Sequence, residues 1–291
     1  MGFGRRAVGA LLAMLAAACS PLKTFDALVP KDSGAGLVLR DARFGNDPRQ
    51  ALDLYAPSAR NGASLPVIVF IYGGSWSSGT KDGYAFVGRA LAARGFLVAI
   101  PDYRLVPDVR YPSFLEDNAA AVRWVVAHAP AHGGDPQRLI LAGHSAGAYN
   151  AAMLAYDPRW LGADRARVHG LIGLAGPYDF LPFDGPIVHA TFDSAPNPAE
   201  TQPIGYVEAG DPPAFLATGD KDTTVRPANS DSLAAHLRAV GVRVARRRYP
   251  NVGHVGLITA VARPFRGKAP VLADMIDFAR SVTAEASTPA R

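Results

Sequence analysis

The sequence has almost no cysteine, since Cys19 is the only one in 291 residues. A single cysteine excludes an internal disulfide framework. The sequence also lacks repeats and low-complexity segments, which excludes solenoid architectures. Its histidines do not form metal-ligand pairs on a helix face, because His128 and His132 have the right spacing but flank Pro130. We therefore expect no metal and no other cofactor.

The sequence also has few clusters of positively charged residues. The formal net charge is +5, and two of the arginines, Arg5 and Arg6, lie in a segment that we expect to be removed. The one cationic run, ARRRY over 245–249, falls in an expected strand without interleaved aromatics or a Gly-rich phosphate loop. Solvated charge on an exposed strand face is the favoured interpretation, so we expect no nucleic-acid partner.

The first 19 residues are typical of a secretory leader. Two arginines precede the apolar stretch AVGALLAMLAAA, which is too short to span a bilayer as a mature helix. Small residues then lead to Cys19. This order predicts a signal peptide over 1–19 and an exported protein, followed by a tether over 20–35 and a folded domain over 36–291.

The end of the leader, LAAAC, resembles the bacterial lipobox, in which the cysteine is acylated and becomes the new N-terminus. The match departs at Ala16, where the motif usually has leucine. We expect lipidation of Cys19 and a membrane anchor in the bacterial cell envelope. The alternative is ordinary cleavage after Ala18, which would release a secreted or periplasmic protein.

Short apolar runs alternate with helical patterns along the rest of the chain. Strands are expected over 65–72, 96–101, 138–143, 168–176, 213–219 and 242–249, and helices over 84–95, 112–129, 145–156, 228–241 and 269–282. This alternation predicts an α/β fold with a mostly parallel central sheet and helices on both faces. Residues 36–57 have two strand-like halves and no helix, so we expect an antiparallel hairpin at one sheet edge.

One proline-rich segment, 177–212, breaks this alternation. A segment of that length without regular structure is often functional, for example as a lid. The alternative is a surface excursion without a role. We treat the segment as a candidate cap. Its apolar residues could line a substrate pocket of modest size: Phe180, Leu181, Phe183, Ile187, Val188, Phe192 and Ile204.

Ser145 lies in the stretch GHSAG, between the apolar run RLILA and the small-residue run AYNAAMLA. G-x-S-x-G at a strand-to-helix turn is typical of a nucleophile elbow. The flanking glycines, Gly143 and Gly147, let strand and helix approach closely, and the turn lifts the hydroxyl out of the sheet near a helix N-terminus. The pattern predicts Ser145 as a catalytic nucleophile.

A serine nucleophile needs a base, and the base needs a carboxylate to orient it. His254 follows the last expected strand in YPNVGHVG, where it can reach the carboxyl ends of the inner strands. Asp222 lies in the loop of LATGDKDTTV, and two residues beyond the strand end let it turn towards His254. We expect Asp222 as the acid and Asp220 as a brace of the loop, with Asp220 and Asp179 as alternatives.

The stretch FIYGGSWSSG, over 70–79, follows a buried strand and supplies a glycine turn. Its backbone amides at Gly74 and Ser75, with that of Ala146, are the expected oxyanion hole for a tetrahedral intermediate. Three further residues are expected to line the substrate pocket: Tyr72, Trp76 and His144.

Four motifs in order, YGGSWSSGTKDGY, AIPDYRLVPDVRYPSFLEDNAAAVRWV, GGDPQRLILAGHSAGAYNAAML and PAFLATGDKDTTVRPANSDSLAAHLRAVG, resemble the α/β-hydrolase carboxylesterases. The nearest branch holds isoprenylcysteine methylesterase-like and feruloyl-esterase-like enzymes. The resemblance implies the same triad and oxyanion amides and leaves the substrate open. One departure is Tyr72, which stands where many relatives have histidine; its ring and polar tip are expected to preserve the loop.

These observations predict a serine hydrolase that cleaves small-molecule carboxylic esters, of small or medium acyl length, through an acyl-serine intermediate. Amide cleavage on the same triad, by an amidase, peptidase or arylformamidase, is an alternative. A non-catalytic envelope binding protein on a degenerate fold is a further alternative, which the intact triad order disfavours. The natural ester and the oligomeric state are left open.

Overall fold

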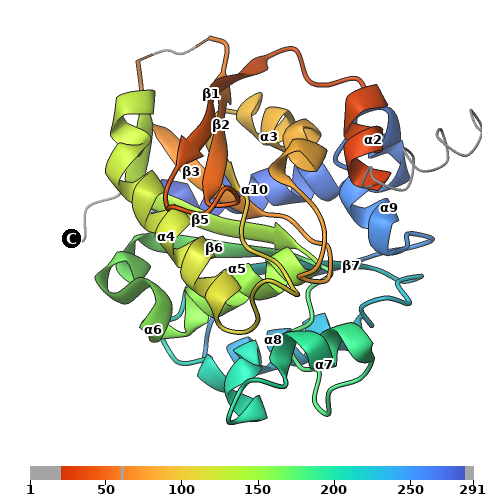
Figure 1. The fold of residues 1–291 in the computed structure, drawn as a ribbon. Helices are drawn as coiled ribbons and strands as arrows, with labels where there is room; N and C mark the ends of the chain where they lie inside the picture. Colours follow the sequence, from red (N-terminus) through yellow and green to blue (C-terminus); the bar gives the residue numbers. More distant parts are fainter. Residues whose placement is uncertain (1–20, 60–61, 286–291) are drawn as a thin grey trace, which may run out of the picture.

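In the computed structural model, which describes residues 21–59 and 62–285, a central sheet organises the molecule (Figure 1). Its eight strands lie in the order β1-β2-β4-β3-β5-β6-β7-β8. They are β1 (Ala35–Arg43), β2 (Ala51–Pro57), β3 (Leu65–Ile71), β4 (Leu97–Pro101), β5 (Gly134–His144), β6 (Val168–Leu174), β7 (Ala214–Gly219) and β8 (Val244–Tyr249).

Only the β1–β2 and β2–β4 pairs are antiparallel; the other described pairs are parallel. The expected hairpin at one sheet edge is therefore confirmed, with β1 outermost. The inner strands are almost wholly apolar and buried, as strands covered on both faces must be. Because parallel strands point the same way, the loops after β3, β5, β7 and β8 meet along one edge of the sheet.

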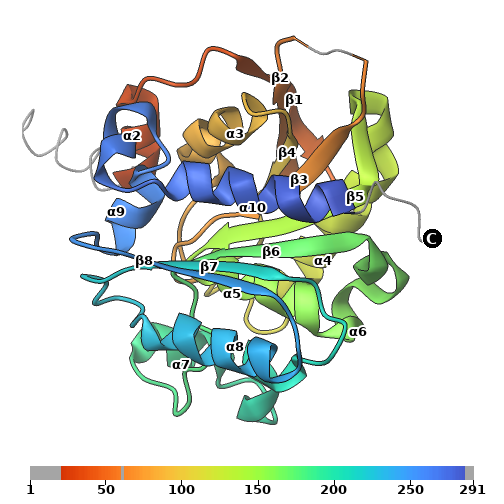
Figure 2. The same ribbon diagram turned by 180° about the vertical axis from the view of Figure 1, so that it is seen from behind.

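Helices cover both faces, which confirms the predicted layering. The α-helices are α2 (Pro21–Leu28), α3 (Ala85–Ala92), α4 (Ser113–His128), α5 (Ala146–Tyr156), α6 (Pro158–Leu161), α7 (Pro186–Phe192), α8 (Ala228–Ala239), α9 (His254–Thr259) and α10 (Val271–Glu285). Short 3₁₀ helices are η1 (Lys81–Tyr84), η2 (Ala129–His132), η3 (Gly162–Arg167), η4 (Pro198–Thr201), η5 (Pro203–Tyr206) and η6 (Arg263–Lys268). Helices α4 and α5 cover one face, and α3 and α10 cover the opposite face, seen in Figure 2. No helix among the described residues is both long and apolar enough to cross a bilayer.

Helix α5 is the centre of the core, because every one of its residues is buried. Its sequence, AGAYNAAMLAY, is rich in alanine, which lets the helix axis approach β5 and β6 closely. The start of this helix is thereby fixed, and Ser145 is the residue immediately before it.

The segment expected as a tether, 20–35, differs from that expectation over its described part. From Pro21 onward the chain forms α2 and docks on the domain. Phe25 packs edge-on against Phe86, with ring centroids 5.3 Å apart, and Asp26 accepts a 2.7 Å hydrogen bond from the Phe86 amide. Asp32 pairs with both Arg94 and Arg266. These apolar contacts and ion pairs hold the segment against the domain, so its described part is not a free tether.

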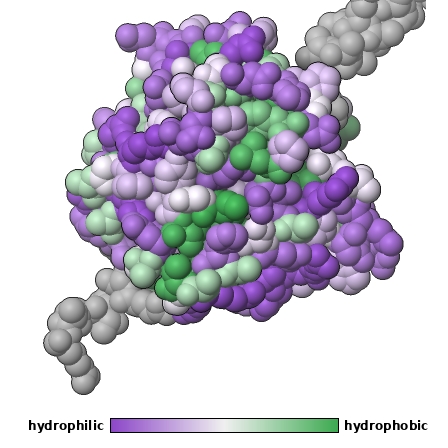
Figure 3. All heavy atoms as spheres, turned by 90° about the horizontal axis from the view of Figure 1, so that it is seen from below, coloured by the Kyte–Doolittle hydropathy of each residue, from purple (hydrophilic) through white to green (hydrophobic). Residues whose placement is uncertain are grey.

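The proline-rich segment, 177–212, contains α7, η4 and η5 rather than structureless chain. Asn229 of α8 accepts hydrogen bonds from the amides of Tyr178 and Asp179, and Gln202 accepts one from Phe180. The segment is thus pinned at its start and across its middle. Seen from the end where α7 and α8 lie, the surface is mostly hydrophilic with separate apolar patches (Figure 3).

The basic run on β8 is tied to neighbouring carboxylates. Arg246 and Arg248 both pair with Asp231, at 2.9 and 2.6 Å, and Arg247 lies 3.8 Å from Asp274. Arg246 is mostly buried. The run therefore includes paired charge that links β8 to the helices beside it, as well as the exposed guanidinium groups expected from the sequence.

Candidate active site

The turn at Ser145 has the geometry that the G-x-S-x-G pattern indicates. Its backbone has φ 55° and ψ −124°, a left-handed conformation that a side-chain-bearing residue adopts only under constraint. A Cβ at Gly143 would lie 2.3 Å from the Gly147 carbonyl oxygen, and one at Gly147 would lie 2.0 Å from that of Ile71. Both glycines are therefore required for β5 and α5 to meet at this turn.

His254 and Asp222 are in direct contact, although 32 residues separate them. The His254 Nδ1 lies 2.7 Å from Asp222 Oδ2. The other carboxylate oxygen accepts the amides of Thr224 and Val225, at 3.0 and 2.9 Å. Burial alone would raise the Asp222 pKa, but the bonds from His254 and the two amides hold that pKa below its ordinary value. Asp222 is thus an ionised, fixed partner for His254.

The loop after β7, which carries Asp222, and the loop after β8, which carries His254, pack closely against each other. A Cβ at Gly219, the last residue of β7, would lie 1.9 Å from the carbonyl oxygen of Val252. Asp220 accepts a 2.7 Å hydrogen bond from the amide of Asn251, so it braces the contact between the loops and lies away from His254. The remaining alternative, Asp179, accepts a 2.6 Å hydrogen bond from Ser232 of α8. Of the three candidate acids, the structure brings Asp222 to His254.

The loop after β3 presents backbone amides beside Ser145. Gly74 has φ 141°, and Ser75 and Trp76 have φ 51° and 57°. A Cβ at Gly74 would lie 2.1 Å from the Ser78 carbonyl oxygen, so the turn needs glycine there. Among the described residues, the amides of Gly74, Ser75 and Ala146 have no hydrogen-bond acceptor. Free amides beside a nucleophile are what stabilisation of an oxyanion requires.

Tyr72 does not line a substrate pocket, which corrects the expectation for this residue. Its side chain is fully buried and stacks between Tyr84 and Tyr103, with centroid separations of 5.6 and 4.8 Å. Burial, and next the nearby Asp102 carboxylate, raise the Tyr72 pKa well above its ordinary value. The phenol therefore stays protonated and donates to Asp102. Tyr72 therefore supports the loop after β3, residues 72–79, from its buried side; we call this loop the candidate oxyanion loop.

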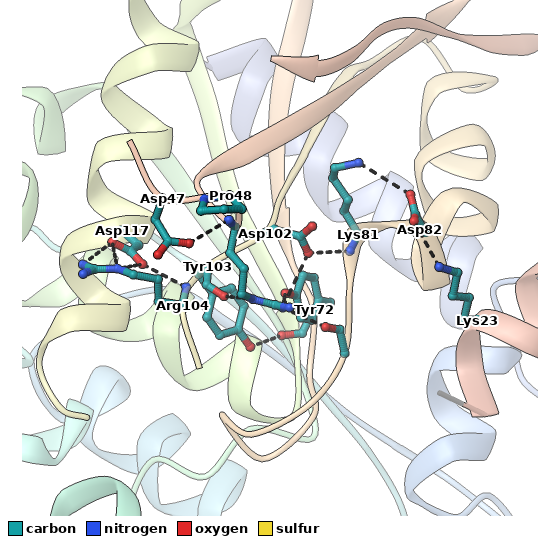
Figure 4. A network of polar contacts seen from close by, with 12 residues as sticks. Lys23, Asp47, Pro48, Tyr72, Lys81, Asp82, Asp102, Tyr103, Arg104 and Asp117 are labelled. Atoms are coloured by element: carbon teal, nitrogen blue, oxygen red, sulfur yellow. Dashed lines mark hydrogen bonds and ion pairs between the residues drawn. The ribbon is translucent and has the colours of Figure 1, made fainter. Parts of the chain in front are cut away.

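A polar network completes this support, and part of it is drawn in Figure 4. Arg49 donates to the Tyr72 hydroxyl at 2.7 Å, to the Gly79 carbonyl at 2.8 Å and to the Tyr103 carbonyl at 2.7 Å. Asp102 accepts the amide of Lys81 at 2.8 Å. Arg49 thus fixes both ends of the loop 72–79. No spacing pattern marks Arg49 in the sequence; the only available signal is the tyrosine at position 72, whose buried hydroxyl needs polar partners.

His144 lines a cavity beside Ser145, as expected, and it also contacts the backbone of His254, which was not expected. Its Nε2 is 3.2 Å from the His254 carbonyl oxygen, and the two rings are 4.8 Å apart. Burial, and next the proximity of His254, lower the His144 pKa to about 3. His144 is therefore neutral near pH 7 and donates its Nε2 proton to the His254 backbone.

Two cavities open on Ser145. The first, of about 640 Å³, is lined by Trp76 as expected and by four apolar residues of the proline-rich segment: Phe180, Leu181, Ile187 and Val188. The second, of about 410 Å³, is lined by His144 and His254, by the glycines of the loop 72–79, and by side chains of α2 and α9. Three further apolar residues expected in the pocket wall, Phe183, Phe192 and Ile204, pack against the core instead.

Within the described part of the chain, no cluster of His, Cys, Asp and Glu could hold a metal ion.

Comparisons with known proteins find relatives over most of this chain. Esterase LipC of Mycobacterium tuberculosis is 30% identical over 239 residues, covering 74% of this chain and 59% of LipC. Carboxylesterase NlhH of the same organism is 32% identical over 231 residues, covering 71% of both chains. Isoprenylcysteine alpha-carbonyl methylesterase ICME of Arabidopsis thaliana is 29% identical over 82% of this chain and 61% of its own. The chain therefore spans about three fifths of the length of LipC and ICME.

Solved structures and a family model extend the comparison. Esterase B from Lactobacillus rhamnosis superposes with a TM-score of 0.81 at 21% identity, over 98% of each chain. A truncated carbohydrate esterase from gut microbiota gives 0.76 at 20% identity, over 88% of this chain and 99% of its own. The predicted α/β-hydrolase fold is thereby confirmed. A family model described as BD-FAE matches residues 52–237, nearly two thirds of the sequence, and the chain therefore belongs to the BD-FAE family.

Proposed function

We propose that this protein hydrolyses carboxylic esters through an acyl-serine intermediate, with Ser145, His254 and Asp222 as its catalytic triad. One observation carries the proposal. His254, which is hydrogen-bonded to Asp222, lines the same cavity as Ser145, a serine held at a left-handed turn. The esterase names of the relatives LipC and NlhH agree with it.

The chemistry follows from these positions. His254 takes the Ser145 proton as the hydroxyl attacks the ester carbonyl, and Asp222 stabilises the imidazolium that forms. The developing oxyanion accepts hydrogen bonds from the free amides of the oxyanion loop and Ala146. His254 then returns the proton to the leaving alcohol. In the second half of the reaction it activates water, which releases the acid from Ser145.

We expect short acyl chains to be preferred, roughly acetyl to hexanoyl. The 640 Å³ cavity has an apolar wall, but the proline-rich segment that forms it is pinned by hydrogen bonds and carries no long amphipathic lid. Each buried methylene contributes about 0.8 kcal/mol, and carbons beyond the cavity contribute nothing. The measurement is kcat/KM for a p-nitrophenyl ester series from acetyl to dodecanoyl, with p-nitroanilides of the same acyl groups as matched amides.

An optimum at decanoyl or longer, or a rate jump when substrate forms micelles, would contradict the short-chain expectation. Equal kcat/KM for the anilide and the ester of one acid would favour the amidase alternative. The anilide comparison is needed because activated esters alone do not separate the two reactions.

We propose further that the chain is exported and anchored to the envelope membrane by lipidation at Cys19, a residue that lies outside the described part. The support is the sequence order of arginines, short apolar stretch and small residues before a lone cysteine. Replacement Cys19→Ser should leave the protein unprocessed or convert it to a soluble form. Fractionation of the native envelope, with intact-mass analysis of the mature protein, checks this. A mature mass without acyl groups would leave plain secretion.

A further inference from the structure

We propose that α2 is a wall of the active site, and that the apolar pocket between α2 and α9 binds the alcohol part of the ester. Leu22 and Phe25 of α2 line the 410 Å³ cavity that ends at Ser145 and His254. In this proposal, the two side chains determine how large an alcohol group the protein accepts. The inference rests on the proposed ester hydrolysis.

The pocket lies between two helices far apart in the sequence. Figures 1 and 2 both show α2 beside α9, and Val255 and Thr259 of α9 line the same pocket as Leu22 and Phe25. The floor is the glycine-rich oxyanion loop and Tyr84. Besides Ser145 and His254, the polar groups of the lining are the neutral His144 and five hydroxyl groups, and no carboxylate, lysine or arginine lines the pocket. The pocket therefore suits an alkyl or aryl group rather than a charged one.

The α2 wall is held in place by contacts on several sides. Phe25 packs on Phe86 and on Phe265, with centroids 5.3 and 5.6 Å apart. Asp26 accepts the hydrogen bond from the Phe86 backbone amide, and its carboxylate also forms an ion pair with Lys31 at 3.0 Å. Figure 4 shows Lys23 reaching Asp82 on η1, at 3.5 Å. A helix fixed in this way presents its side chains to a substrate without first having to be ordered.

The position of His254 decides which half of the ester enters this pocket. In acylation His254 must deliver a proton to the leaving oxygen, so the alcohol has to lie on the His254 side of Ser145. His254 lines the pocket at α2, whereas the larger cavity is lined by Ala146 and the proline-rich segment without His254. The alcohol is therefore assigned to the α2 pocket and the acyl group to the larger cavity.

Two substrate series separate these assignments: acetates of linear alcohols from ethanol to hexanol, and ethyl esters of linear acids from acetic to hexanoic. For the unaltered protein we expect kcat/KM to rise with alcohol length by up to about fourfold per buried methylene. Leu22→Ala should lower the hexyl-to-ethyl acetate ratio about tenfold, and Leu22→Trp, which narrows the pocket, should lower it further. The slope of the acyl series should not change in either variant.

Two controls complete the design. Leu28→Ala removes a residue at the other end of α2 that is 80% exposed, and it should leave the hexyl-to-ethyl acetate ratio unchanged. Val188→Ala, in the larger cavity, should flatten the acyl series and leave the alcohol series alone. Phe25 also packs against the core, so Phe25→Ala could lower activity by destabilising the fold. For this variant only the hexyl-to-ethyl acetate ratio is compared, after its unfolding midpoint has been measured.

A Leu22→Ala protein whose two series change in parallel, or an unaltered protein indifferent to alcohol length, would overturn the inference alone. Absence of hydrolysis of ethyl acetate and all its longer homologues by the unaltered protein would overturn the proposed function as well.

Discussion

Ser145→Ala is expected to lower kcat for ester hydrolysis about a million-fold, the typical cost of removing a triad nucleophile. The fold should survive, because alanine keeps the Cβ and the backbone bond from the residue 145 amide to the Leu174 carbonyl, 2.8 Å in length. Without the hydroxyl no acyl-enzyme can form, and the amides of the oxyanion loop have no tetrahedral intermediate to stabilise. Steady-state rates on a p-nitrophenyl acetate substrate, with a thermal unfolding curve, measure both effects.

Covalent labelling by a fluorophosphonate gives an independent readout of the same variant. The unaltered protein and Ser281→Ala, a matched change on α10 far along the chain from the elbow, should both be labelled, and Ser145→Ala should not. Activity of Ser145→Ala within tenfold of the unaltered protein would remove Ser145 from the mechanism and, with it, the proposed triad.

Asp222→Asn is expected to lower kcat about ten-thousand-fold, by analogy with the loss of the orienting carboxylate in a Ser-His-Asp triad. The oxygen of the new side-chain amide could still accept the backbone amides of Thr224 and Val225, so the loop should keep its shape. The side chain could no longer stabilise an imidazolium charge, and an NH₂ group facing His254 Nδ1 would favour the wrong tautomer. Stopped-flow or steady-state kinetics at neutral pH measure the loss.

Asp220→Asn is the natural control for this substitution, because Asp220 lies two residues away and contacts the Asn251 amide instead of His254. We expect a loss of less than about tenfold, since a bond of this kind contributes about 1 kcal/mol. If the two variants exchanged their effects, Asp220 would be the acid and the 2.7 Å contact between His254 and Asp222 would be catalytically idle.

The placement of the loops that carry Ser145, Asp222 and His254 could be predicted from the sequence because chain order largely determines it. In a parallel sheet the loops after β3, β5, β7 and β8 gather at one edge, so Ser145, Asp222 and His254 converge once the strands are placed. Local patterns sufficed for that step, since glycine spacing and apolar runs mark both strand ends and tight turns. The choice of Asp222 over Asp220 followed from loop length alone.

The surroundings of the site could not be predicted in the same way, because they depend on contacts between distant residues. The direction of the Tyr72 side chain is set by two stacked tyrosines and by Arg49, which lies in the hairpin loop between β1 and β2. The docking of α2 depends on Phe86 and Phe265, neither of which any local pattern connects to Phe25. Side-chain direction and helix docking are tertiary properties that periodicity does not encode.

The two ion pairs of Asp32 have a consequence for the order of folding. Asp32 contacts Arg94 and also Arg266, and the second contact spans 234 residues. A chain emerging from the ribosome or from an export channel cannot close that loop until nearly all of it is available. The contacts of this segment with Phe86 and Arg94 need only the first third of the chain, whereas its contacts with Phe265 and Arg266 come last. The pocket wall that the segment provides is therefore completed only after the strands β5, β7 and β8 have been made. A protein cut short before residue 265 would retain Ser145, Asp222 and His254 and yet lack the contacts of Phe265 with Phe25 and of Arg266 with Asp32.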